Sequence, residues 1–242
     1  MHYKICHFKS LTSTQDKAKD FAEKGLSDIV VVADTQTKGR GRFRRKWYSD
    51  RGGLWMSILL KPNNIINLQY LTFAAAIAAL ESIKKLTNIK TSIKWPNDLH
   101  YKGKKLCGIL TEGVFGKENY VMVGIGLNIN QSSFPDKIKN TTTSLRTIKK
   151  NTLDIEKLTR KLNEEFFNLY KNYYNKNRFA SILKIWKKNC DTINKNATIT
   201  TKTKKLQGKV IGIDKDGNLL LKMKNDKIVR IMEGDVKVRY QS

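Results

Sequence analysis

The sequence contains little cysteine and no long hydrophobic run. Cys6, Cys107 and Cys190 are odd in number and far apart, so they provide neither a disulfide framework nor a Cys-x-x-Cys metal pair. The longest apolar run, residues 71–80, is about half of the roughly 20 residues that a membrane span needs, and the polar start at residues 1–4 is no signal peptide. These absences favour a soluble protein of the reducing cytoplasm.

Acidic residues are scarce, since 21 aspartates and glutamates face 47 lysines and arginines, which leaves a net charge of +26. Such a charge attracts nucleic acid or an acidic protein. The excess is mostly lysine, however, and it is spread along the chain beside abundant asparagine and isoleucine, as an AT-rich genome would supply. No zinc-finger spacing or leucine-zipper heptad accompanies it, and the basic stretches at 187–188 and 202–205 lack interleaved aromatics. The charge alone therefore assigns no function.

The chain has enough apolar material for a core, because 40% of its 242 residues are hydrophobic. Apolar runs and turn signals predict strands at 29–33, 54–60, 92–95, 105–112 and 120–128. A buried helix is predicted at 67–86 with Asn67 as its N-cap, followed by an amphipathic helix from Ile155 to Tyr173 and a shorter one at 179–186. The length and these elements fit one ordinary domain with a small appendage.

The pattern changes after Asn189 to short predicted strands at 197–201, 206–213, 219–223, 227–232 and 236–240. Asp216 and Gly217 form a hairpin turn pair between two of them. About 45 residues of this kind cannot bury a large core, but they can close a small barrel that packs on the main domain. We therefore expect two domains, residues 1–194 and 195–242.

A loop rich in arginine and glycine, residues 36–47, separates the first two predicted buried strands. Gly39 and Gly41 permit close approach of the backbone, and the guanidinium forks of the arginines bind phosphate or carboxylate at two points. The loop is no dinucleotide fingerprint, because the third glycine would fall at Arg44, and the chain has no P-loop. The pattern favours an anion-binding loop, with a solvated basic loop as the alternative.

Three further segments carry candidate site residues. Lys94 ends a predicted strand and is followed at once by Trp-Pro-Asn-Asp, which suits a rigidly held charge facing a cleft, although a plain turn would look similar. The stretch 124–130 ends an apolar strand with two glycines and two asparagines, whose amides can reach a phosphate or a metal-bound water. Ser13, Thr14 and Gln15 precede a helical stretch, so they form a helix cap or bind a small polar ligand.

Taken together, these segments closely resemble the biotin protein ligases, also called biotin-[acetyl-CoA-carboxylase] ligases or holocarboxylase synthetases. The resemblance extends from about Ser13 to the last predicted strands, and it is most specific in the Gly-Arg-Gly-Arg loop, in Lys-Trp-Pro-Asn-Asp, and in residues 105–112 and 124–128. It implies a ligase that activates biotin with ATP to biotinyl-5'-AMP, releases pyrophosphate, and transfers biotin to one lysine of a biotin carrier domain, as in acetyl-CoA carboxylase. Mg²⁺ is expected to accompany ATP.

The same resemblance implies the roles of individual residues. The implied biotin site comprises Ser13, Thr14, Gln15, Gln36, Gly39, Arg40, Gly41, Arg42 and Lys94. The implied nucleotide site comprises Arg42, Arg45, Trp47, Asn97 and Asn128, with Lys94 and Arg42 as the catalytic cations. Gln15 stands where relatives often have Asn, and Arg44 where some have Gly. Residues 37–47 are expected to close over the bound intermediate and exclude water.

The resemblance also implies a fold and excludes some partners. The expected fold class is α+β, with a mixed β-sheet flanked by helices as in class II aminoacyl-tRNA synthetases, and a small C-terminal SH3-like β-barrel. Some relatives begin with a DNA-binding domain, for which this sequence leaves no room before Ser13, so we expect no specific nucleic acid partner, no membrane partner, and a monomer or homodimer. The rivals are a lipoate ligase or octanoyltransferase, whose Arg-Arg-x-Ser-Gly-Gly-Gly segment is absent here, and a nucleic-acid-binding regulator, which only the charge favours.

Overall fold

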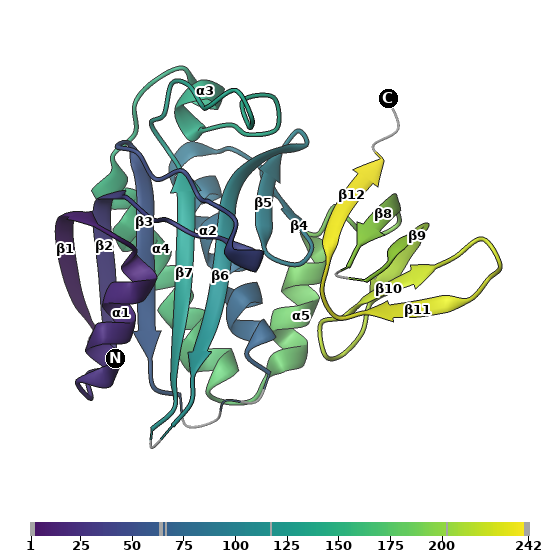
Figure 1. Cartoon of the computed structure of the whole chain (residues 1–242), viewed down its shortest axis with the longest axis horizontal. Coiled ribbons are helices and arrows are strands. Elements are labelled where there is room, and N and C mark those ends of the chain that lie inside the picture. The colour runs from purple at the N-terminus through teal and green to yellow at the C-terminus, as the bar shows by residue number, and fades with distance from the viewer. Residues whose placement is uncertain (1–2, 63–64, 66, 117, 202, 240–242) are drawn as a thin grey trace.

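A computed structural model describes residues 3–62, 65, 67–116, 118–201 and 203–239. Its larger part is a seven-stranded mixed sheet in the order β1-β2-β3-β7-β6-β5-β4, in which β1 and β2 are parallel and the other neighbours antiparallel (Figure 1). The strands are β1 (Lys4–Leu11), β2 (Ile29–Gln36), β3 (Gly53–Leu60), β4 (Ser92–Lys94), β5 (Asp98–Tyr101), β6 (Lys104–Val114) and β7 (Tyr120–Asn128).

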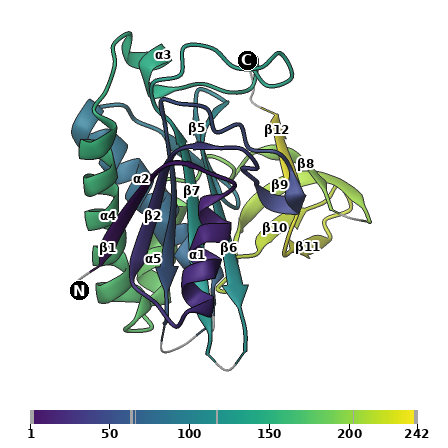
Figure 2. The same cartoon turned by 60° about the vertical axis from the view of Figure 1, so that its left-hand side comes forward.

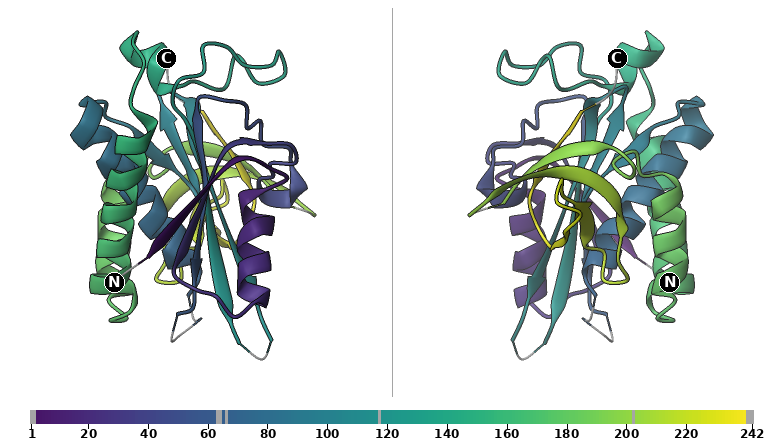
Figure 3. Two further views of the ribbon diagram at one scale, coloured as in Figure 1. Left: turned by 90° about the vertical axis from the view of Figure 1, so that its left-hand side faces the viewer. Right: turned by 90° about the vertical axis from the view of Figure 1, so that its right-hand side faces the viewer.

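Helices cover both faces of this sheet. The helices α2 (Gln69–Thr87), α4 (Ile155–Leu169) and α5 (Phe179–Lys188) lie on one face, and α1 (Thr14–Glu23) lies on the other (Figures 2 and 3). Because successive side chains of a strand point to opposite faces, Val30 and Val32 of β2 join the large core under α2, whereas Ile29 and Val31 join a smaller core under α1. Burial on both faces explains why β2 is a continuous apolar run in the sequence.

The predicted helices occur with changed ends. The sequence predicted Asn67 as the N-cap of α2, and this is wrong, because the N-cap is Leu68. Asn67 has φ 63°, and its carbonyl accepts a hydrogen bond from the Tyr70 amide (2.9 Å), so Asn67 belongs to the turn before the helix. The amphipathic helix changes after Leu169 into a π-helical segment, Tyr170–Tyr174. The eight-residue strand β1, the four-residue strand β5 and the short helix α3 (Leu145–Lys149) were not predicted.

The C-terminal strands form a separate antiparallel sheet in the order β11-β10-β9-β8-β12. Its strands are β8 (Asn196–Thr200), β9 (Lys205–Ile213), β10 (Leu219–Lys222), β11 (Ile228–Ile231) and β12 (Asp235–Arg239). Within the described ranges, the outer strands β11 and β12 do not pair, so the expected barrel is an open five-stranded sheet and is not closed. The strand predicted at 236–240 is β12 in the structure, and residue 240 lies outside the described residues. Residues 1, 2 and 202, which belong to the polar start and to the basic stretch named above, also lie outside them.

The C-terminal sheet packs beside the β4 edge of the large sheet (Figure 1). The Trp95 indole N–H donates a hydrogen bond to the Gly217 carbonyl (3.0 Å), and the Tyr70 hydroxyl donates one to the Lys215 carbonyl. Val210 and Leu221 of the smaller sheet belong to the same buried cluster as α2. One continuous core therefore holds the two sheets together. No helix in the described part of the chain is both long and apolar enough to cross a membrane.

Candidate active site

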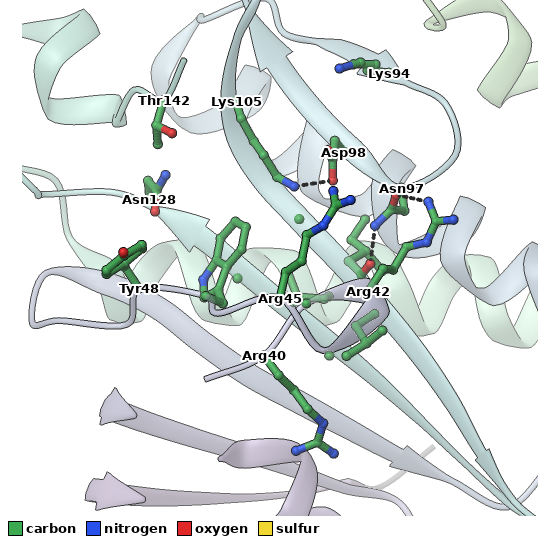
Figure 4. A pocket seen from close by; sticks show the side chains of 18 of the residues that line it. Arg40, Arg42, Arg45, Tyr48, Lys94, Asn97, Asp98, Lys105, Asn128 and Thr142 are labelled. Atoms are coloured by element: carbon green, nitrogen blue, oxygen red, sulfur yellow. Dashed lines mark hydrogen bonds and ion pairs between the residues drawn. The ribbon is translucent and has the colours of Figure 1, made fainter. Parts of the chain in front are cut away.

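A cavity of about 600 Å³ lies against the large sheet, between the arginine loop, the ends of β4 and β5, and the start of β12 (Figure 4). This volume is typical of a small-molecule site. The structure brings twelve of the thirteen predicted site residues to its wall: Ser13, Thr14, Gln15, Gln36, Arg40, Gly41, Arg42, Arg45, Trp47, Lys94, Asn97 and Asn128. Together with residues of β12, the cavity wall thus runs from the start of α1 to the last strand of the chain.

Gly39 is the predicted site residue that does not line the cavity. A Cβ at this position would lie 2.5 Å from the Ser49 hydroxyl oxygen and 2.7 Å from the Trp47 carbonyl oxygen. The amide of Trp47 also donates a hydrogen bond to the Gly39 carbonyl (2.9 Å), so the two arms of the loop touch here. Gly39 therefore serves the close packing of the loop on itself.

The start of α1 forms one end of the cavity through a chain of neutral hydrogen bonds. Ser13 is the N-cap of the helix, as the cap interpretation predicts, and accepts a hydrogen bond from the Gln15 amide (3.2 Å). The Gln36 side-chain oxygen accepts from the Thr14 amide (2.8 Å) and the Thr14 hydroxyl (3.1 Å), and its NH₂ group donates to the Ser49 hydroxyl (2.8 Å). These bonds fix the positions of the polar groups before any ligand binds.

Arg40 belongs to this end of the cavity, and its charge is fully paired. Its guanidinium donates to Asp16 (2.5 Å), Ser13 (3.2 Å) and Glu112 (3.0 Å). Burial alone lowers the pKa of Arg40, but the two carboxylates outweigh it, so its pKa is raised. The Gln15 NH₂ group also donates to Glu112 (2.8 Å), whereas the Gln15 side-chain oxygen is buried without a partner in the described structure. Asp16 and Glu112 were not among the predicted site residues.

The tip of the arginine loop directs two other guanidiniums to the opposite end of the cavity (Figure 4). Arg42 donates to the Asn97 side-chain oxygen (3.1 Å), and Asn97 in turn donates to the Ile109 carbonyl (2.7 Å). Arg45 forms an ion pair with Asp235 at the start of β12. Burial is the main cause that lowers the pKa of Arg42, so the structure places this cation where charge is costly.

Lys94, at the end of β4, is a half-buried cation of the site whose charge is only partly compensated. Burial lowers the pKa of Lys94, and the nearby charge of Asp98 only partly opposes that effect. The ammonium makes no hydrogen bond or ion pair within the described ranges. Asp98 instead lies 2.7 Å from the Lys105 ammonium (Figure 4). Asp98 and Lys105 were quoted within the motifs, but neither was predicted as a site residue.

His100, which also was not predicted, lines the cavity beside Lys94 and is 5% exposed. Burial and then the charge of Lys94 lower its pKa to about 4, so the ring is neutral near neutral pH. Its Nδ1 lies 3.1 Å from the Gly103 carbonyl, which can only accept, so Nδ1 carries the proton and donates. Nε2 is then an unprotonated acceptor, buried without a partner among the described residues. A single histidine on a short unpredicted strand gave no sequence signal for this position.

The Trp47 indole lies flat against two paired glycines of the sheet. Gly108 of β6 is opposite Gly126 of β7, and a Cβ at either position would come within 2.9 Å or 2.5 Å of the ring. The Lys105 ammonium lies 5.1 Å from the centroid of the Trp47 ring, which is within the range of a cation–π interaction. The Trp47 ring N–H is buried without a partner in the described structure. The two glycines therefore make the flat surface that this aromatic ring requires.

Charge in the cavity is strongly unbalanced. Among the described residues that line it, seven are cations and two are carboxylates, and the two carboxylates, Asp98 and Asp235, already pair with Lys105 and Arg45. The described residues contain no group of three His, Cys, Asp or Glu side chains that could hold a metal ion. An anionic ligand is the partner that such a cavity fits.

Comparison with known proteins identifies the family. Residues 6–130 match the model of the biotin/lipoate A/B protein ligase family, and residues 192–239 match the biotin protein ligase C terminal domain. The chain therefore belongs to the biotin/lipoate A/B protein ligase family. The resemblance to biotin protein ligases inferred from its motifs is confirmed.

Individual relatives agree with this assignment. The chain is 37% identical over 237 residues to the bifunctional ligase/repressor BirA of Bacillus subtilis (strain 168), covering 94% of this chain and 72% of the relative. It is 33% identical over 126 residues to the biotin–[acetyl-CoA-carboxylase] ligase of Mycobacterium tuberculosis, covering 50% and 46% of the two chains. The structure of a biotin protein ligase from Aquifex aeolicus in complex with biotin and ATP superposes with a TM-score of 0.88 at 30% identity, covering 99% of this chain and all of that one. The α+β fold class is confirmed by this match.

Proposed function

We propose that this protein is a biotin–[carboxylase carrier protein] ligase, acting in the cytoplasm, which forms biotinyl-5'-AMP and then biotinylates a lysine of a carrier domain. The observation that carries the proposal is the division of one cavity into two ends, a hydrogen-bonding end whose arginine is paired with carboxylates and an end with an excess of positive charge. Biotin has a neutral ureido ring and a carboxylate, and ATP supplies a polyanion. One cavity with these two ends suits the joining of the two substrates.

The biotin ureido group is assigned to the end of the cavity at α1. Ser13, Thr14, Gln36 and Arg40 supply donors and acceptors that their own hydrogen bonds hold in place. The unpartnered side-chain oxygen of Gln15 is an acceptor that suits a ureido N–H. This assignment keeps Gln15 in the site although relatives often have Asn there.

The nucleotide is assigned to the other end. The guanidiniums of Arg42 and Arg45 suit the phosphates, and the Trp47 indole offers a flat aromatic surface for the base. Asn97 orients Arg42, and the Asn128 amide, which donates to the Thr143 carbonyl (3.1 Å), lines the far part of the cavity. Mg²⁺ enters this proposal with ATP, coordinated mainly by its phosphates.

In the first step, a biotin carboxylate oxygen attacks the α-phosphorus of ATP, a new P–O bond forms, and the bond to the β-phosphate bridge breaks to release pyrophosphate. Lys94 and Arg42 offset the repulsion between the two anions and stabilise charge that develops in the transition state. No side chain needs to act as a nucleophile. Gly41 lets the loop backbone approach the reacting groups closely.

In the second step, the amine of the carrier lysine attacks the acyl carbon of biotinyl-5'-AMP. A C–N bond forms, the C–O bond to the phosphate breaks, AMP leaves, and the amine releases its proton to solvent. The mixed anhydride hydrolyses readily in water, so closure of residues 37–47 protects it. We assign these steps to a catalytic domain, residues 1–194, with residues 195–242 as the C-terminal domain.

An assay of ATP–pyrophosphate exchange with biotin, lipoate or octanoate tests this proposal. We expect exchange to depend on biotin, followed by biotinylation of a carrier domain. Exchange driven by lipoate or octanoate alone would assign the protein to the lipoate side of its family, and no exchange with any of the three acids would contradict a ligase function. The match of residues 192–239 to the biotin protein ligase C terminal domain favours the first outcome.

A further inference from the structure

Phe43, at the tip of the arginine loop, is 42% exposed and does not line the cavity. Its ring nevertheless touches both guanidiniums that the proposed function gives to the nucleotide. The Arg42 guanidinium carbon lies 4.9 Å and the Arg45 guanidinium carbon 5.7 Å from the ring centroid. Both distances are within the range of cation–π attraction.

The backbone of the tip is bent in a way that makes these contacts possible. Phe43 and Arg44 both have φ 56°, in the left-handed region that residues with a side chain rarely adopt. The turn is closed by hydrogen bonds from the Gly41 amide to the Arg45 carbonyl (2.8 Å) and from the Arg45 amide to the Arg42 carbonyl (3.2 Å). This conformation brings the Phe43 ring close to the guanidiniums of Arg42, the preceding residue, and of Arg45, two positions further along the chain.

The two guanidiniums need such a contact because they repel each other. Burial is the largest cause that lowers the pKa of Arg42, and the charge of Arg45 lowers it further. Among the described residues, the polar side-chain partner of Arg42 is the amide of Asn97, and that of Arg45 is the carboxylate of Asp235. The electron-rich face of an aromatic ring attracts both cations. Because the ring carries no negative charge, it does not compete with a phosphate for the two guanidiniums.

We propose that Phe43 is a positioning residue that holds Arg42 and Arg45 together as one two-cation clamp for the phosphates of the nucleotide. The proposal rests on the proposed function, since it uses the assignment of these arginines to ATP. Phe43 acts through the arginines and does not itself contact the substrate. Its removal affects ATP and leaves biotin untouched, because the biotin end of the cavity is organised by separate hydrogen bonds.

The test compares Phe43→Leu with Phe43→Tyr and with Phe115→Leu. Leucine keeps an apolar side chain but lacks the aromatic face, tyrosine keeps that face, and Phe115 is a matched control because it is 61% exposed and lies outside the cavity wall. In pyrophosphate exchange, Phe43→Leu should raise the KM for ATP about 5-fold, with the KM for biotin and the kcat within about 2-fold. Phe43→Tyr should restore the KM for ATP, and Phe115→Leu should not change it.

Direct binding separates failure of this proposal from failure of the proposed function. Calorimetric titration with ATP and with inorganic triphosphate reports on the clamp whether or not the protein reacts with biotin. Weaker triphosphate binding by Phe43→Leu, but not by Phe43→Tyr or Phe115→Leu, supports the clamp even if biotin-dependent exchange is absent. Equal binding by wild type and Phe43→Leu, or equal loss in the leucine and tyrosine variants, overturns it.

Discussion

The two ends of the cavity handle positive charge in opposite ways. At the α1 end, Arg40 is held between Asp16 and Glu112, and its pKa is raised. At the other end, Lys94 has no ion pair in the described structure, Arg42 has only a neutral amide, and burial lowers the pKa of both. In the described structure, the α1 end therefore pairs its arginine with carboxylates, whereas the other end holds two cations, Lys94 and Arg42, that have no carboxylate partner.

This difference indicates what each end is built to receive. A fully paired arginine can orient a neutral ligand by directed hydrogen bonds, but it has little charge left to offer. A buried cation without a counter-charge costs stability, and an anionic ligand removes that cost when it binds. The second end thus has its positive charge in place before the phosphates arrive, which is the condition for electrostatic stabilisation of a transition state.

The largest expected effect comes from removing the unpaired charge. Lys94→Met should reduce biotin-dependent pyrophosphate exchange by roughly 100-fold or more, because methionine keeps the buried stem and removes the cation. The same variant should be slightly more thermally stable than wild type near neutral pH, since it no longer holds a half-buried ammonium whose desolvation the nearby aspartates only partly offset. A folded variant with wild-type exchange would contradict the assignment of Lys94.

The stability gain should depend on pH in a defined direction. The pKa of Lys94 in the folded protein lies below 10.5, the usual value for a lysine in an unfolded chain. Between the folded pKa and 10.5, the unfolded chain therefore binds more protons than the folded protein. Wild-type stability should therefore rise, relative to Lys94→Met, as pH approaches 10.5. Thermal midpoints of both proteins across this range measure the effect; a constant difference would show that Lys94 is not destabilised by burial.

A second variant tests whether the flat surface under Trp47 belongs to the nucleotide end. Gly126→Ala places a Cβ 2.5 Å from the indole nitrogen, so the ring must move. We expect the KM for ATP to rise about 10-fold, with a smaller change for biotin. Gly212→Ala is the matched control, because a Cβ at that strand glycine meets nothing within 4 Å. Equal changes in the KM for ATP and the KM for biotin would mean that Trp47 does not belong specifically to the nucleotide end.

A third, smaller effect should appear at the paired end. Glu112→Gln keeps a hydrogen-bonding group but removes one of the two charges that hold Arg40. Because charge-assisted hydrogen bonds are about twice as strong as neutral ones, we expect biotin affinity to fall about 5-fold. Titration calorimetry measures this, with Glu118→Gln as a control that removes a surface carboxylate paired with Lys61. Unchanged biotin affinity would show that the Arg40 cluster is not part of the biotin site.

The sequence predicted the residues of this cavity better than it predicted their partners. Local motifs carry the loop arginines, Lys94, Asn97 and the start of α1, because each depends on neighbours in the chain. The carboxylates that make the two ends different come from far away: Glu112 is 72 positions from Arg40, and Asp235 is 190 from Arg45. Only the fold brings such pairs together.

The unpredicted elements have physical reasons of their own. The strand β1 lies at an edge, where five of its eight residues are exposed, so it lacks the continuous apolar run that marks β2. The strand β5 begins at Asp98, the last residue of the Lys-Trp-Pro-Asn-Asp segment, whose Trp-Pro-Asn-Asp part was interpreted as a turn. His100 lies on that strand, which explains why it was not recognised as a cavity residue.

The smallest expected effect concerns the positive charge outside the cavity. The net charge of +26 comes mostly from lysines that are spread along the whole sequence, in contrast to the cations gathered at the nucleotide end. Binding to DNA at about 0.15 M salt, where screening acts over about 8 Å, should therefore be micromolar or weaker and independent of sequence. Fluorescence titrations with random and operator-like duplexes measure this. Nanomolar binding to one sequence would show that the positive charge outside the cavity also serves a specific function, which would contradict this prediction.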